Sequence, residues 1–286
     1  MVLQSISCCL RGNLVGTEMV VTRYKNPGKH LGLRLALVTD LHNCDHTTLI
    51  QMLREEHPDA ILCAGDILER HDESLPEWTG SKMDAVINSI GKQNAMEKIM
   101  WLLDRLTERT GRATHEEKDT AIEFLKQLPA IASTFYSVGN HEWYFLQPDY
   151  HVFKEKGITL LDNAECVVEV KGQQVRIGGL STRYDLDWLK TFSEKAGYKI
   201  LMCHHPEYYR KAIEGTTLDT FDLIVSGHYH GGQWRVFNRS VYVPRTGLFL
   251  KNARGQSDRL IISAGTANTT RFPRYGNPCE LVMIEI

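Results

Sequence analysis

Polar residues able to bind a metal ion follow five apolar stretches of the sequence, at the point where each stretch ends. Every ending supplies at least one aspartate or histidine, and each apolar stretch has the character of a buried strand. Because ligands bind at the carboxyl ends of strands in open α/β sheets, we expect the five endings to converge on one site. The endings are Asp40-Leu41-His42, Gly65-Asp66, Gly139-Asn140-His141-Glu142, His204-His205-Pro206 and Gly227-His228-Tyr229-His230.

The candidate ligands combine carboxylate oxygen, imidazole nitrogen and amide oxygen. This combination suits a hydrolytic Zn, Mn, Fe or Co site better than a soft thiolate site. Seven side chains are too many for one ion, but they suit two ions about 3.5–4 Å apart that share a bridging carboxylate. Such a pair clamps a phosphoryl group for in-line attack, and a nearby histidine that does not bind metal protonates the leaving alkoxide. The seven candidates are Asp40, His42, Asp66, Asn140, His204, His228 and His230.

Each ending also has an ordinary structural explanation. A single Asp or His after a strand is commonly a turn residue or a hydrogen-bonded core side chain. The pairs Gly65-Asp66 and Gly139-Asn140 are common turn sequences. Five endings in order, each after an apolar strand, argue against coincidence.

The spacing of apolar residues predicts the elements that position these side chains. Residues 33–38 and 60–64 are predicted to be buried strands, and a helix over about 49–56 connects them. Asp40 and His42 are two positions apart, so in extended backbone their side chains face the same side. The sequence therefore predicts a β-α-β unit with candidate ligands at both strand ends.

A long segment at about 70–129 precedes the third strand and is predicted to be a helical insertion. Apolar spacing predicts a helix over roughly 84–109, and Thr114 with Glu117 has the capping-box spacing for a second helix. The simpler interpretation is that these helices pack on their neighbours, and the alternative is a lid over the site. Without a linker, low-complexity segment or internal repeat, the chain is predicted to be a single domain over 1–286.

The second half of the chain is predicted to be rich in strands. Residues 134–138 lead into the third ending, and a short helix over 150–156 follows. Residues 158–161, 166–170 and 174–177 are predicted to form an antiparallel series.

The composition is that of an ordinary globular protein. Of 286 residues, 42% are hydrophobic and 24% charged, and the formal net charge is -2. This balance does not favour a sequence-independent grip on nucleic acid, so positive charge for binding phosphate is expected to come from metal. Seven cysteines without CxxC spacing indicate free thiols in a reducing compartment. No apolar run reaches the roughly 18 residues of a transmembrane segment and no signal peptide is recognisable, so we expect a cytoplasmic protein.

The order of the five endings resembles the signature of the calcineurin-like metallophosphoesterases, which is D-x-H, G-D, G-N-H-[DE], H and G-H-x-H. The match covers residues 40–230 and includes every block. It implies an α/β fold, a two-sheet α/β/β/α sandwich of the metallophosphoesterase type. Residues 226–233, Gly265-Thr266 and residues 271–278 look nearest to the bacterial YkuE-type phosphodiesterase group.

The resemblance also implies a role for each candidate. His141 is expected to contact phosphate and act as the general acid without binding metal. Arg70, Arg183 and Arg271 are candidates for contacting the substrate phosphate, with surface or structural roles as the alternative. The implied metal ligands are Asp40, His42 and His230 for the first ion, Asn140, His204 and His228 for the second, and Asp66 as the bridge.

We therefore predict hydrolysis of phosphate esters that depends on two divalent or mixed-valence metal ions, Mn, Zn, Fe or Co. A phosphodiester or pyrophosphate is the expected substrate, and a phosphomonoesterase, including a protein phosphatase, is the alternative. A non-catalytic protein-binding scaffold is the alternative outside enzymes, but such a scaffold is expected to have lost ligands or His141. The expected partner is a small phosphorylated substrate, and the sequence leaves the oligomeric state open.

Overall fold

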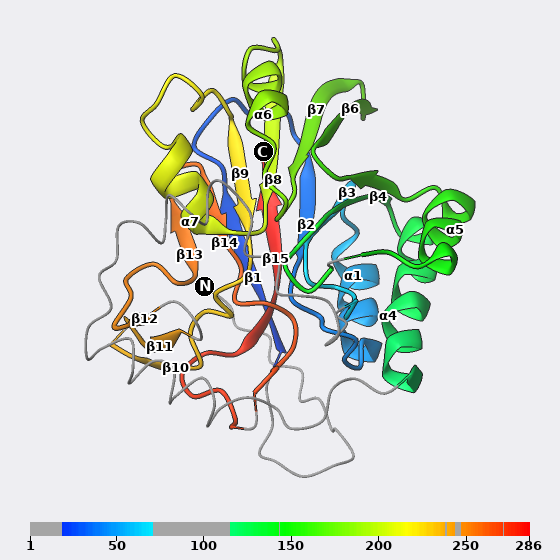
Figure 1. Ribbon diagram of the computed structural model, residues 1–286, viewed down its shortest axis with the longest axis vertical. Helices are drawn as coiled ribbons and strands as arrows, with labels where there is room; N and C mark the ends of the chain where they lie inside the picture. Colours follow the sequence, from blue (N-terminus) through cyan, green and yellow to red (C-terminus); the bar gives the residue numbers. More distant parts are fainter. Residues whose placement is uncertain (1–18, 71–114, 143, 238, 244–246, 271) are drawn as a thin grey trace.

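The strands of the protein form two six-stranded sheets that pack face to face, together with a small three-stranded sheet (Figure 1). Helices cover the outer face of each large sheet, so the layers follow the order α/β/β/α. This arrangement confirms the predicted two-sheet α/β fold class. The computed structural model describes residues 19–70, 115–142, 144–237, 239–243, 247–270 and 272–286.

The first large sheet combines strands from the first half of the chain with the last strand. β15 pairs antiparallel with β2, and all other neighbours pair parallel. In spatial order the strands are β1 Met19–Lys25, β15 Cys279–Glu285, β2 Arg34–Val38, β3 Ala60–Ala64, β4 Ser133–Ser137 and β5 Thr159–Leu161.

The second large sheet is built from the second half of the chain. β6–β7 and β13–β14 pair antiparallel, whereas β7, β8, β9 and β14 run parallel to one another. Its order is β13 Gly255–Ser257, β14 Leu260–Ile262, β9 Leu223–Ser226, β8 Tyr198–Cys203, β7 Gln173–Leu180 and β6 Ala164–Val170. The third sheet consists of β10 Trp234–Val236, β11 Arg239–Val243 and β12 Gly247–Leu248.

The predicted antiparallel series over 158–161, 166–170 and 174–177 is wrong in its first member. β5 pairs parallel with β4 at the edge of the first sheet, and only β6 and β7 form an antiparallel hairpin. The reason is the helix between β4 and β5, which supplies the crossover that a parallel neighbour requires.

Alternate side chains of the central strands enter two different cores. On β2, Leu35 and Leu37 face the second sheet, whereas Ala36 and Val38 face the helices. This alternation is the period of two that a strand imposes. The helices over the first sheet are α1 Thr47–Glu56, α4 His115–Gln127, the 3₁₀ turn Leu128–Ala130 and α5 Gln147–Lys156. Those over the second are α6 Leu186–Ser193, α7 Pro206–Tyr208 and the π-helical turn Tyr209–Ile213.

The predicted helical insertion lies largely outside the described residues. The helix expected over 84–109 is in that part of the chain, and the second predicted helix corresponds to α4. The boundaries of the insertion, the lid and the single domain stay predictions. Every helix among the described residues is too short or too polar to cross a bilayer.

Candidate metal centre

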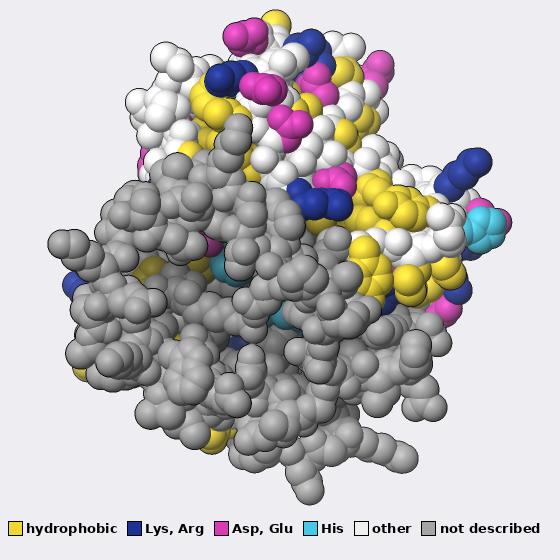
Figure 2. All heavy atoms as spheres, in the orientation of Figure 1, with side chains coloured by type: hydrophobic (Ala, Val, Ile, Leu, Met, Phe, Trp, Pro, Cys, Tyr) yellow, Lys and Arg dark blue, Asp and Glu magenta, His cyan; other side chains and the backbone are white. Residues whose placement is uncertain are grey.

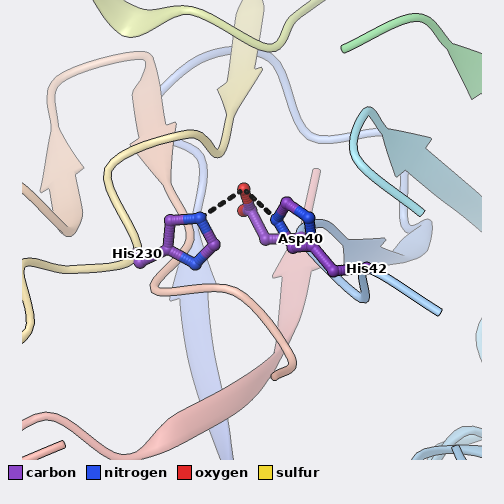
Figure 3. Close-up of side chains that lie close together, drawn as sticks. All are labelled: Asp40, His42 and His230. Atoms are coloured by element: carbon purple, nitrogen blue, oxygen red, sulfur yellow. Dashed lines mark ion pairs between the residues drawn. The ribbon is translucent and has the colours of Figure 1, made fainter. Parts of the chain in front are cut away.

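Asp40, His42 and His230 form one group of donor atoms, with the Asp40 carboxylate between the two imidazoles (Figure 3). The Nε2 atoms of His42 and His230 lie 3.9 and 3.5 Å from Oδ1 of Asp40. The segment after β2 supplies the first two residues, and the segment after β9 supplies the third. Both large sheets therefore contribute to this group.

Asp66, directly after the β3 strand and Gly65, connects this group to a second one. Its Oδ2 lies 3.8 Å from Nε2 of His42 and 3.1 Å from Nε2 of His204. Asp66, His204 and His228 form the second group of closely spaced donor atoms. Asn140 adjoins it, with its Oδ1 atom 2.8 Å from Nδ1 of His228. The structure thus brings all seven predicted ligands to one edge of the two sheets.

The donor atoms at this edge fit a cation. Oδ2 of Asp66 and Nε2 of both His42 and His204 are buried and have no hydrogen-bond partner. Such atoms are costly in a protein interior. Although burial lowers it, the carboxylates of Asp66 and Asp40 raise the pKa of His204 to about 10. These atoms would gain a partner, and the negative charge would be compensated, if a metal ion were bound, so the residues fit a metal site.

The other ring nitrogen of two candidate ligands faces a hydrogen-bond acceptor. Nδ1 of His204 lies 2.8 Å from the carbonyl oxygen of Ala64, and Nδ1 of His42 lies 2.5 Å from Oε1 of Glu69. A histidine that donates from one nitrogen presents the lone pair of the other. The contacts therefore leave Nε2 of both rings as the nitrogen that would face a metal ion at the centre.

His230 has a different neighbour, the guanidinium group of Arg274. This group lies 3.4 Å from Nδ1 of His230 and also donates hydrogen bonds to the carbonyl oxygens of Ala264 and Ala267. Burial, followed by His42 and Arg274, holds the pKa of His230 well below its ordinary value. The ring is therefore kept in the neutral form, which is the form that binds metal.

Left-handed backbone carries most of the predicted ligands. Residues other than glycine rarely adopt the left-handed conformation, and each residue held in it costs of the order of 1–3 kcal/mol. Close packing accompanies this backbone, because a Cβ on Gly139 would lie 2.2 Å from Oδ1 of Asp66 and one on Gly227 would lie 2.5 Å from Oδ2 of Asp40. The two motifs therefore require their glycines. The φ angles are 55° for Asp40, 50° for His42, 56° for Asp66, 70° for His228 and 48° for His230.

Glu69 connects a predicted ligand with the predicted general acid. While Oε1 contacts His42, its Oε2 lies 3.0 Å from Nδ1 of His141. Burial raises the pKa of Glu69, but His141 and His42 outweigh burial and hold it well below its ordinary value. The His141 side chain is 27% exposed. Figure 2 shows one face of the molecule in the orientation of Figure 1, and histidine side chains are visible near the centre of that face. The sequence alone predicted no role for Glu69. The only feature of the sequence that could have drawn attention to this residue is its position three residues after the predicted ligand Asp66.

Glu142, which the sequence left without a role, ties the segments after β3 and β4 together. Its fully buried carboxylate accepts hydrogen bonds from the backbone N–H groups of Gly139, Ile67 and Leu68, at 2.6, 2.8 and 3.1 Å. The N–H of Asp66 donates to it as well, at 3.1 Å. Glu142 therefore fixes the backbone on either side of the predicted bridging carboxylate.

A second glutamate, Glu207 in α7, lies on the other side of the centre. Its Oε1 is 3.2 Å from Nδ1 of His205 and 3.6 Å from Nε2 of His228. Nε2 of His205 lies 2.9 Å from the hydroxyl of Thr182. Both ring nitrogens of His205 are thus engaged, and its side chain is 8% exposed. No pattern in the sequence pointed to Glu207, since its partner His228 comes from another strand end.

The three arginines predicted to contact the substrate phosphate do not share one environment. Arg70 forms a buried, two-pronged ion pair with Asp149, with nitrogen–oxygen distances of 2.7 and 2.6 Å. Arg183 pairs with Asp162 and is 40% exposed. Arg271 lies outside the described residues. A phosphate contact by these arginines stays a prediction, with the guanidinium groups of the first two already paired.

Residues 33–232 match the family model described as calcineurin-like phosphoesterase. Among curated proteins, the uncharacterized protein YpbG of Bacillus subtilis (strain 168) is 33% identical over 142 residues, which are 47% of this chain and 51% of that protein. An uncharacterized metallophosphoesterase of Helicobacter pylori (strain ATCC 700392 / 26695) is 26% identical over 169 residues, 57% of this chain and 45% of that protein. The chain spans about half the length of these curated relatives.

Solved structures resemble the chain more distantly. A 5'-nucleotidase precursor from Thermus thermophilus shares 14% sequence identity at a TM-score of 0.39. The alignment covers 74% of this chain and 44% of that one. A structural similarity as weak as this does not indicate the function of the chain.

Proposed function

The chain belongs to the calcineurin-like phosphoesterase family, whose model covers residues 33–232, and from that premise we propose that it hydrolyses phosphate esters with two metal ions. The observation that carries this proposal is the position of Asp66. Its buried Oδ2 has no hydrogen-bond partner and lies between Nε2 of His42 and Nε2 of His204. A carboxylate in that position is suited to join two metal sites.

Seven side chains would hold the two ions, and their division follows two of the four groups of closely spaced donor atoms among the described residues. When bound, such ions neutralise charge on the phosphoryl group and activate water at neutral pH. Glu69 and the Ala64 carbonyl orient two of the imidazoles, and Glu142 holds the backbone around Asp66. Asp40, His42 and His230 are proposed for the first site, Asn140, His204 and His228 for the second, and Asp66 for both.

His141 is proposed as the general acid. Glu69 accepts a hydrogen bond from its Nδ1, so Nε2 is the atom proposed to give a proton to the leaving alkoxide when substrate is bound. The side chain is also partly exposed, in contrast to the buried His42 and His204. The position of His141 at the border between buried centre and surface suits contact with a substrate from solvent.

A phosphodiester or a pyrophosphate is the proposed substrate class, within a group of YkuE type. The support is the sequence of residues 226–233 and 271–278. In the described part of these stretches, Gln233 donates to the carbonyl of Phe272, and Asn277 donates to the carbonyl of His230 at 2.7 Å. The residues that resemble the group therefore support the segment that follows a predicted ligand.

A substrate panel tests this function. The chain is freed of metal, reconstituted with Mn, Zn, Fe or Co, and assayed on p-nitrophenyl phosphate, bis-p-nitrophenyl phosphate and a pyrophosphate diester, with elemental analysis of the protein as purified. We expect metal-dependent hydrolysis, fastest on the diester or the pyrophosphate, and about two metal ions per chain. Preference for the monoester contradicts the substrate class. Hydrolysis that persists without metal, or that Asn140→Ala leaves unchanged, contradicts the proposed mechanism.

A further inference from the structure

Exposed hydrophobic side chains gather around the third sheet. Nine large hydrophobic side chains are exposed among the described residues, and five of them lie between residues 234 and 275. We name these five the aromatic surface, and they are Val236, Phe237, Phe249, Phe272 and Tyr275. Contiguous exposed apolar groups on a soluble domain mark interaction sites more often than isolated ones do.

Two phenylalanines of the aromatic surface stand at turns where the fold does not require them. Phe237 directly follows β10 and is 96% exposed, and Phe249 directly follows β12 and is 63% exposed. Their φ angles are 47° and 53°, a conformation that glycine or asparagine adopts at less cost. Neither ring is buried in a core, so packing in the folded protein does not explain why phenylalanine occupies these two positions.

The aromatic surface belongs to a strongly basic part of the chain. Residues 223–279 contain eight Lys and Arg but one acidic residue, Asp258, although the whole chain has a net charge of -2. Several of these cations are engaged inside the protein, as Arg254 is with Glu280. Arg239 and Lys251 are exposed, and neither forms an ion pair within the described residues. The nearly balanced charge of the whole chain thus conceals a local excess of positive charge.

The two exposed cations lie side by side next to the aromatic side chains. The N–H of Ser240 donates to the carbonyl of Leu250 at 3.2 Å, so the adjacent Arg239 and Lys251 are neighbours across the β11 edge. Arg239 is also the cross-strand partner of Val236. In sequence each cation follows an exposed phenylalanine by two positions. The end of the third sheet therefore combines apolar rings with positive charge.

We propose that the aromatic surface binds the surface of an anionic lipid bilayer. Phe237 and Phe249 would enter the boundary between headgroups and acyl chains, and Arg239 and Lys251 would contact lipid phosphates. The charge of the region is complementary to this partner. β10 begins four residues after His230, and Arg274 contacts His230 from the neighbouring loop, so binding would hold the metal centre close to the membrane.

Single-stranded nucleic acid is also anionic, but the geometry of the rings does not favour it. Bases stack on aromatic rings that lie in a basic groove. The ring of Phe237 is 96% exposed at a turn, so no neighbouring surface supports one of its faces. The half-exposed side chain of Val236 beside it is aliphatic, so it can neither stack on a base nor form a hydrogen bond with one. A bilayer, in contrast, accepts projecting apolar side chains in any orientation.

Vesicle sedimentation with the full chain tests the proposal. Phosphatidylcholine vesicles with and without phosphatidylglycerol are compared for the unaltered protein, Phe237→Ser/Phe249→Ser, Arg239→Gln/Lys251→Gln, and the control Val167→Ser, an exposed side chain on β6 that is 44% exposed. We expect binding to the anionic vesicles only. Each cation removed should weaken binding about fivefold, as expected near an anionic membrane surface. The phenylalanine pair should weaken it at least as much, and the control should not change it.

Hydrolysis of bis-p-nitrophenyl phosphate in the absence of lipid should be the same for all four proteins, and this verifies that the variants fold. Equal binding to neutral and anionic vesicles, or equal loss in Val167→Ser, overturns the proposal. It is also overturned if the unaltered protein does not bind vesicles. Preferential binding of a single-stranded oligonucleotide that depends on the same four residues would assign the surface to nucleic acid instead.

Discussion

Two glutamates flank the candidate metal centre, and each lies between a predicted ligand and a second histidine. One arrangement is on the side of the first sheet and the other on the side of the second. In both, burial raises the pKa of the glutamate, but the histidines outweigh burial and hold it well below its ordinary value. The arrangements are His42–Glu69–His141 and His228–Glu207–His205.

The two arrangements differ in the contacts of the glutamate. Glu69 uses one oxygen for each ring, at 2.5 Å from His42 and 3.0 Å from His141. Glu207 presents a single oxygen to both of its rings, at 3.2 Å from His205 and 3.6 Å from the ligand candidate. Only the first glutamate lies within hydrogen-bond distance of a predicted ligand, so we expect it to orient its ligand more strongly.

The outer histidines differ even more. His141 is 27% exposed, whereas His205 is 8% exposed and has its second nitrogen 2.9 Å from the hydroxyl of Thr182. A general acid must reach the atom to which it gives a proton. The same pair of residue types can therefore supply a proton donor on one side and a structural support on the other.

Asp66→Asn changes the carboxylate that lies between the two groups of donor atoms and should have the largest effect. Its carboxylate lies near Nε2 of His42 and of His204, and the amide would lose the charge that attracts a second cation. We expect hydrolysis of bis-p-nitrophenyl phosphate to fall by more than about 10³-fold, beyond the 10–100-fold typical of outer partners. Elemental analysis should find less than two metals per chain, and circular dichroism should find the fold retained. Undiminished turnover would rule out a bridging role.

His141→Ala and His205→Ala separate the two outer histidines. Loss of a general acid costs typically 10²–10⁴-fold in rate, so kcat should fall by about that factor in His141→Ala. His205→Ala should lower kcat less than about tenfold, because a support acts only through its neighbours. Both variants should keep their metals in elemental analysis. A loss of about one metal in His141→Ala would make this residue a ligand.

The sequence was sufficient to predict what depends on local pattern. The apolar run over 33–38 predicts a buried strand, and the structure places its two faces in two different cores. The endings of the strands likewise predicted which residues meet. The sequence could not predict that β5 leaves the antiparallel series, because a parallel partner depends on where a crossover helix returns the chain.

The roles of the residues that support the centre could not be predicted from the sequence, for a related reason. Glu142 accepts hydrogen bonds from Ile67 and Leu68, which are more than seventy residues away in the chain. Glu207 likewise meets His228 only after two strands have paired. A motif marks the candidate ligands, whereas the contacts of the residues that support them depend on the register of neighbouring strands, which the pattern does not encode.

Glu69→Gln and Glu207→Gln compare the two glutamates directly. The amide keeps the size of the side chain but removes its charge and one acceptor. We expect metal affinity to fall about 10–100-fold in Glu69→Gln, as for other outer partners of metal-binding histidines, and by less than about tenfold in Glu207→Gln. Competition with a chromogenic chelator measures both values. Equal losses would mean that the longer contact to His228 shortens when the metal binds, and the asymmetry would disappear.

Thr182→Val should have the smallest effect and tests whether His205 is only a support. Valine keeps the shape of threonine but leaves Nε2 of His205 without its hydroxyl partner, and an unsatisfied buried group costs about 1–3 kcal/mol. We expect the melting temperature to fall by several degrees, since 1 kcal/mol corresponds to about 2–4 °C in domains of 150–250 residues. In contrast, kcat should change less than about twofold, and Thr182→Ser should restore stability. If kcat instead falls tenfold at an unchanged melting temperature, His205 takes part in the chemistry, and the two sides of the centre are more alike than their exposure indicates.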